Sequence, residues 1–119
     1  MIVRFALVAA ALVAGVVTAD AHSALERSEP RAGSRLKTAP AEVKLWFTER
    51  LEPAFSSVQV QTTAGRRVDR ADGRVDERAA TLLRAGVAPL TPGTYRVVWR
   101  VLSVDGHVTD GAFTFRVEP

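Results

Sequence analysis

The sequence has 119 residues, enough for one domain and too few for two. It contains no cysteine, which excludes disulfides, thiolate metal sites, iron–sulfur clusters and cysteine catalysis. The formal net charge is +3 at pH 7. The arginines are scattered along the chain, with local density only over residues 66–78. A nucleic-acid-binding protein would concentrate them together with interleaved aromatic residues, so that function is not expected.

The first 21 residues have the features of a secretory signal peptide. A positively charged start is followed by an uncharged, apolar run over residues 5–17, and Ala19 and Ala21 place small side chains where signal peptidase requires them. The apolar run is shorter than the roughly 20 residues that a membrane-spanning helix needs. We therefore expect cleavage after Ala21, export, and a mature domain of residues 22–119 that is not embedded in the membrane.

Hydrophobic residues in the mature domain alternate with a period of two. The alternation is clear over residues 43–48, 58–61, 95–102 and 113–118, and it predicts strands that bury one face. Turn signals such as Pro92-Gly93 and Asp105-Gly106 separate these runs, and no window is typical of a long amphipathic helix. The pattern predicts an all-β, antiparallel sandwich or barrel of six to eight strands.

The middle of the domain is different in composition. Residues 66–78 combine arginines with Asp69, Asp72, Asp76 and Glu77. We interpret this segment as a solvated loop.

Two histidines are candidates for metal binding. Cleavage after Ala21 would leave His22 at the new N-terminus, where its α-amine and its Nδ1 can chelate one ion together. The ordinary pKa of an α-amine is about 7.7–8, so a metal can displace its proton near neutral pH. A histidine elsewhere in a chain offers only a ring nitrogen.

The second histidine, His107, lies two residues after Asp105. In an extended segment these side chains project to the same side, and Gly106 between them allows the backbone to bend. One amine, two imidazoles and one carboxylate form a sulfur-free donor set that suits tetragonal Cu(II), with zinc as the main rival ion. On its own, Asp-Gly is more typical of an ordinary hairpin turn than of a metal site.

Longer stretches of the chain carry a further signal. Residues 90–117 read LTPGTYRVVWRVLSVDGHVTDGAFTFRV, and this stretch resembles the C-terminal signature of the CopC family of periplasmic copper-binding proteins. His22, the Ser28-Glu29-Pro30 segment, Gly33 and the strand ending at Glu49 agree with its N-terminal part. The similarity extends over essentially the whole mature domain.

This resemblance implies a Greek-key β-sandwich or barrel, cupredoxin-like or immunoglobulin-like, that binds one Cu(II) per chain. It implies that His22, Asp105 and His107 are the metal ligands and that Glu49 lies behind them as an outer-shell residue. It also implies a monomeric periplasmic carrier or buffer for copper resistance or homeostasis, not an enzyme, that delivers copper to a CopD-like inner-membrane transporter. Some relatives carry a methionine-rich Cu(I) loop. The only methionine here is Met1, so the Cu(II)-only subtype is expected.

Two other functions remain open at this point. A copper monooxygenase would also use an N-terminal histidine brace, but it needs an open coordination position, which Asp105 would fill. A metal-free immunoglobulin-like interaction module would leave both histidines without a role. Serine-hydrolase chemistry is not expected, because no nucleophile-elbow pattern surrounds Ser103.

Overall fold

The computed structural model describes residues 24–119. The predicted signal peptide, its cleavage site and His22 lie outside these residues. Among residues 24–119, no helix is long and apolar enough to cross a membrane.

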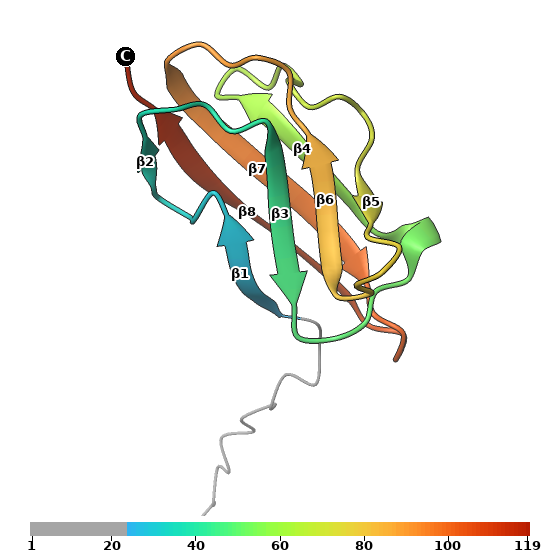
Figure 1. Cartoon of the computed structure of the whole chain (residues 1–119). Helices are drawn as coiled ribbons and strands as arrows, with labels where there is room; N and C mark the ends of the chain where they lie inside the picture. Colours follow the sequence, from blue (N-terminus) through green and yellow to red (C-terminus); the bar gives the residue numbers. More distant parts are fainter. Residues whose placement is uncertain (1–23) are drawn as a thin grey trace, which may run out of the picture.

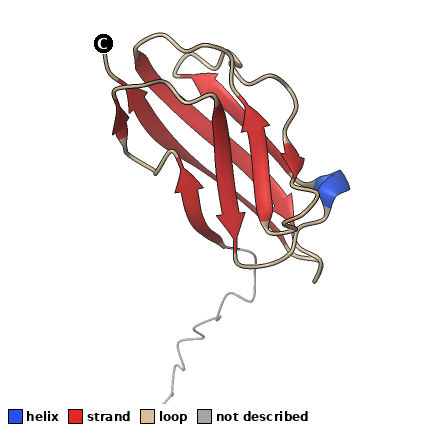
Figure 2. Ribbon diagram, viewed as in Figure 1, coloured by secondary structure: helices blue, strands red, loops and turns tan. Residues whose placement is uncertain are grey.

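The described chain is built from strands and one short 3₁₀ turn (Figures 1 and 2). The elements are β1 (Leu25–Glu29), β2 (Arg35–Leu36), β3 (Glu42–Phe47), η1 (Pro53–Phe55), β4 (Ser57–Thr62), β5 (Arg74–Val75), β6 (Leu82–Gly86), β7 (Gly93–Leu102) and β8 (Val108–Val117). This confirms the predicted all-β fold.

The strands form two four-stranded sheets that pack face to face (Figure 1). The strand order is β1-β3-β6-β5 in one sheet and β2-β8-β7-β4 in the other. All neighbouring strands are antiparallel except β2 and β8, which are parallel. The chain crosses repeatedly from one sheet to the other, so segments far apart in sequence meet at each end of the sandwich.

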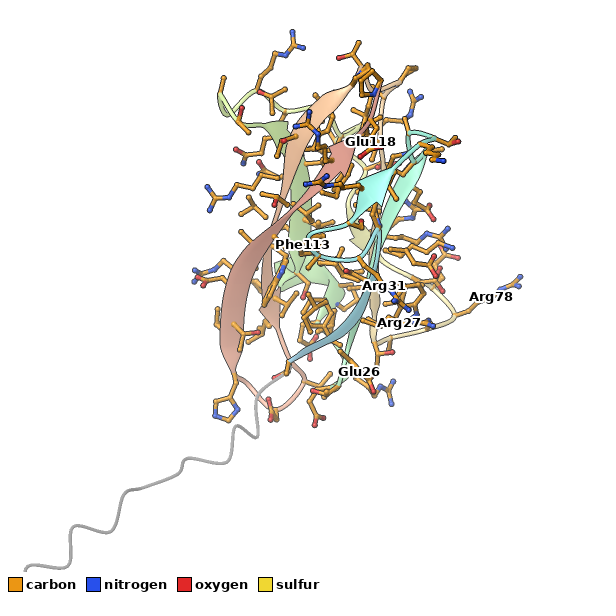
Figure 3. All side chains as sticks on the ribbon, turned by 90° about the vertical axis from the view of Figure 1, so that its left-hand side faces the viewer. Glu26, Arg27, Arg31, Arg78, Phe113 and Glu118 are labelled. Atoms are coloured by element: carbon orange, nitrogen blue, oxygen red, sulfur yellow. The ribbon has the colours of Figure 1, made fainter. Side chains whose placement is uncertain are left out.

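The core is formed by the hydrophobic side chains that the strands direct into the space between the two sheets. In β3, Val43, Leu45 and Phe47 are buried, as the period-two pattern predicts. Phe115 and Val117 fill the same role in β8, and Phe113, further along that strand, is partly buried and packs against the core. Figure 3 shows Phe113 on the side of the sandwich that faces the viewer. Alternation therefore identified the core residues of the long strands correctly.

One sequence-based interpretation is wrong in part. The segment 66–78 is not simply a solvated loop, because it contributes β5 to a sheet and buries the side chain of Asp69 completely. That carboxylate accepts hydrogen bonds from the backbone N–H groups of Val60 and Ala71, at 2.9 and 3.1 Å. The prediction inferred solvent exposure from the density of charged residues. A carboxylate can nevertheless be buried when both of its oxygens accept hydrogen bonds.

Candidate metal centre

The predicted ligands Asp105 and His107 lie in the tight turn between β7 and β8. Ser103 N donates to His107 O at 2.9 Å, and Gly106 N donates to Ser103 O at 2.9 Å. Gly106 has φ +90°, a conformation that L side chains rarely adopt. The Asp-Gly signal was therefore read correctly as a turn.

The structure brings the two side chains together. His107 Nδ1 lies 3.2 Å from Asp105 Oδ1, and the backbone N–H of His107 points at the same oxygen from 3.3 Å. The reason differs from the one predicted, because residues 104–106 form a turn and not a strand. The turn, rather than strand alternation, places the imidazole beside the carboxylate.

The surroundings of Asp105 favour the anionic form of its carboxyl group. The hydrogen bond from the Ser103 hydroxyl, helped by the contacts from His107, lowers the pKa of the Asp105 carboxyl against a smaller opposing effect of burial. The carboxylate is therefore ionised at neutral pH. The side chains of Asp105 and His107 are 38% and 47% exposed, so an ion bound here would lie near the surface of the molecule.

The start of β1 is fixed at the same end of the sandwich (Figure 1). Ala24 N donates to Thr48 Oγ1 at 3.0 Å, and Thr48 N donates to Ala24 O at 3.0 Å. Two residues further on, Arg50 O accepts a hydrogen bond from Val104 N at 2.9 Å. The segment after β3 thus joins the beginning of the described chain to the turn that carries Asp105.

Glu49 occupies the middle of this connecting segment, between Thr48 and Arg50. It is exposed, and it follows the end of β3, as expected for a strand-end residue. Its predicted outer-shell role stays a prediction.

The full donor set is not assembled within the described residues. Of the three predicted ligands, Asp105 and His107 come together, and His22 lies outside residues 24–119. Within that range no group of three histidine or acidic side chains is arranged to hold a metal ion.

Sequence reasoning missed the importance of Ser103, which it considered only as a nucleophile. In the structure Ser103 is 1% exposed, and its hydroxyl donates to Asp105 Oδ1 and lies 3.3 Å from the carbonyl oxygen of His107. The position of this serine two residues before an Asp-Gly turn is the signal that could have indicated it.

The chain is similar in sequence to known proteins. The family model described as "CopC domain" matches residues 25–118. The chain belongs to the CopC family. It is 35% identical over 118 residues to protein YobA of Escherichia coli K12, covering 97% of this chain and 94% of that protein. It is also 35% identical over 106 residues to copper resistance protein C of Pseudomonas syringae pv. tomato, covering 84% of this chain and 83% of that protein.

The fold agrees with a solved structure from the same family. The crystal structure of CopC from Methylosinus trichosporium OB3b superposes with a TM-score of 0.73 at 33% sequence identity. The match covers 82% of this chain and 95% of that chain. The β-sandwich predicted from the strand pattern is therefore the architecture of the CopC family.

Proposed function

We propose that this CopC-family chain is a copper-binding protein of the periplasm that holds one Cu(II) ion for copper resistance or homeostasis. The proposed ligands are the α-amine and imidazole of His22, the carboxylate of Asp105 and the imidazole of His107. The observation that carries the proposal is the contact between Asp105 and His107 at the end of the sandwich where β1 begins.

Chain geometry supports the participation of His22. Ala24 is held to Thr48 by two hydrogen bonds, and His22 precedes Ala24 by two residues. Two residues of extended chain span at most about 7 Å. An N-terminus at residue 22 is therefore confined to the same end of the molecule as Asp105 and His107.

The chemistry of the donors supports cupric copper. Three nitrogen donors and one carboxylate oxygen suit the tetragonal geometry of Cu(II), which also leads the divalent affinity series. The mature domain has neither cysteine nor methionine, so it offers no sulfur ligand for Cu(I). Zinc, which prefers a tetrahedral arrangement, is the competitor that a binding experiment must include.

A carrier fits this donor set better than a catalyst does. Three residues that supply four donors fill the plane around Cu(II) and leave no equatorial position for substrate or oxygen, unlike catalytic metal sites. Because Asp105 and His107 are partly exposed, an ion held by them would be accessible to another protein. We propose that a CopD-like inner-membrane transporter is the recipient.

Electron paramagnetic resonance of the mature protein with one equivalent of Cu(II) tests the N-terminal chelate. A variant with one extra residue before His22 converts the α-amine into an amide, and we expect its copper signal to show fewer nitrogen donors. Its affinity should fall by more than the roughly 10–100-fold that loss of an outer-shell group costs. Identical spectra and equal affinities would refute the proposed ligand set.

A further inference from the structure

Ser103 is the least exposed of the three buried serines in the described chain, with 1% of its surface exposed. Ser28 and Ser56 are also buried, but each is 7% exposed. The hydroxyl of Ser28 donates to the carbonyl oxygen of Pro30, and that of Ser56 lies 3.5 Å from the carbonyl oxygen of Leu102. Only Ser103, among these three, directs its hydroxyl to the side chain of a proposed metal ligand.

The backbone around Ser103 is held on both sides. Ser103 N donates to His107 O, and its own carbonyl oxygen accepts from Gly106 N. A bridge pairs Ser103 with Leu51, which is itself buried in the core. The next residue, Val104, is hydrogen-bonded to Arg50. The hydroxyl therefore projects from a backbone anchored to the sandwich and not from a free loop.

The polar contacts to the Asp105 carboxylate fall on one of its two oxygens. The Ser103 hydroxyl, the His107 backbone N–H and His107 Nδ1 all meet Oδ1. Within the described residues, no hydrogen bond or ion pair involves Oδ2. One oxygen is thus held by the protein, and the other is left for a further partner.

We propose that Ser103 is a positioning residue for copper: its hydroxyl fixes Oδ1 of Asp105 so that Oδ2 is presented to the ion. This inference rests on the proposed function. The terminal torsion of an aspartate side chain has only broad preferences, so a carboxylate with 38% exposure would otherwise sample many orientations. Holding one oxygen reduces the ordering that metal binding would require.

Replacing Ser103 by alanine removes the hydroxyl and keeps both ligands. We expect the affinity for Cu(II) to fall by about 10- to 100-fold, the usual cost of losing an outer-shell partner. The copper hyperfine splitting should also change, because the carboxylate would coordinate in more than one orientation. Ser103→Thr keeps the hydroxyl and should restore both the affinity and the spectrum.

Two further variants make the experiment decisive. Ser56→Ala removes another buried serine hydroxyl next to Leu102 and should leave copper binding unchanged. Asp105→Asn removes the carboxylate itself and reports on the ligand set. Affinity is measured by competition with a chelator, the spectrum by paramagnetic resonance at one equivalent of Cu(II), and the free energy of unfolding with urea.

Each outcome has a definite meaning. Weaker binding and an altered spectrum in Ser103→Ala, with recovery in Ser103→Thr, support the positioning role. Wild-type affinity and spectrum in Ser103→Ala overturn it, and so does an equal loss in Ser56→Ala, which would indicate a merely structural effect. If Asp105→Asn also matches the wild type, the proposed function fails as well, so the two failures are distinguishable.

Discussion

Two aspartates of this protein organise turns, and they use their oxygens differently. In Asp69, Oδ1 accepts from Val60 N and from Arg67 Nε, and Oδ2 accepts from Ala71 N and from Arg67 Nη2. In Asp105, the three contacts fall on Oδ1. Asp69 is completely buried, and Asp105 is partly exposed. An aspartate whose two carboxylate oxygens both accept hydrogen bonds stabilises the fold. An aspartate with hydrogen bonds to only one oxygen can use the other oxygen to bind a ligand.

The largest expected effect concerns Asp105. Asp105→Asn should weaken Cu(II) binding by more than about 100-fold, above the range for an outer-shell loss, because an ionised donor is removed. The unfolding free energy should change less than in Asp69→Asn, since an amide oxygen can still accept from Ser103.

The matched control for this prediction is Asp110→Asn. Asp110 is 72% exposed, and its recorded ion pair is a 3.8 Å contact with Arg100. Chelator competition should give this variant wild-type affinity. A similar loss of affinity in both variants would point to a general effect of charge and contradict the assignment of Asp105.

Asp69→Asn should differ from Asp105→Asn by lowering the stability of the fold without weakening copper binding. It replaces a buried charged acceptor, so we expect a loss of about 1–3 kcal/mol in the free energy of unfolding with copper affinity unchanged. Urea denaturation of the metal-free protein measures the first quantity and chelator competition the second. Stability equal to that of Asp110→Asn would show that the Asp69 hydrogen bonds contribute nothing.

The two turns also differ in how they use a positive φ. Gly106 has φ +90°, and a Cβ there would meet no atom within 4 Å, so Gly106→Ala should cost only the backbone strain of about 1–2 kcal/mol. Ala71 already has φ +58°, next to Asp69. Ala71→Gly should therefore gain about 0.5 kcal/mol once the entropic cost of glycine is subtracted. Thermal denaturation of both variants checks the opposite signs.

The smallest effect is the pH dependence of stability. Burial raises the pKa of Asp69, but the hydrogen bonds from Arg67, Val60 and Ala71 outweigh it and hold the pKa below its ordinary value of 3.8. A depressed pKa in the folded state means that the stabilisation is complete above pH 3.8 and is lost as the pH falls towards the lower folded value. Melting temperatures of the metal-free protein should fall more steeply below pH 3.8 than those of Asp69→Asn. Parallel curves would contradict this.

The sequence predicted the strands that alternate and missed those that do not. β3, β4, β7 and β8 each bury one face, and their pattern was visible. β1 buries only Ser28 completely, and its pairing with β3 is irregular between Leu25 and Arg27. In β6, Leu82 and Leu83 are both buried in succession, which breaks the period of two. β2 and β5 have two residues each and are too short for any periodicity.

The contact between Asp105 and His107 was predictable from the sequence, but the packing that holds their turn in place was not. Asp105-Gly106-His107 indicated a turn with two donors, and the structure places those donors in contact. The role proposed for Ser103 depends on its bridge to the buried Leu51 and on the path of residues 48–52, which follow β3 of the other sheet. The spacing of Ser103 from the Asp-Gly turn is visible in the sequence, but the long-range packing that buries Ser103 is not.

The paired hydrogen bonds between Ala24 and Thr48 have a consequence for maturation. They fix the chain two residues after His22, so cleavage one residue earlier or later than predicted would shift the new terminus by about 3.3 Å, more than a coordinate bond tolerates. Before the cut, the nitrogen of His22 belongs to a peptide bond and cannot act as an amine. In the proposed ligand set, the chelate is therefore complete only after cleavage, and the uncleaved precursor lacks the amine donor.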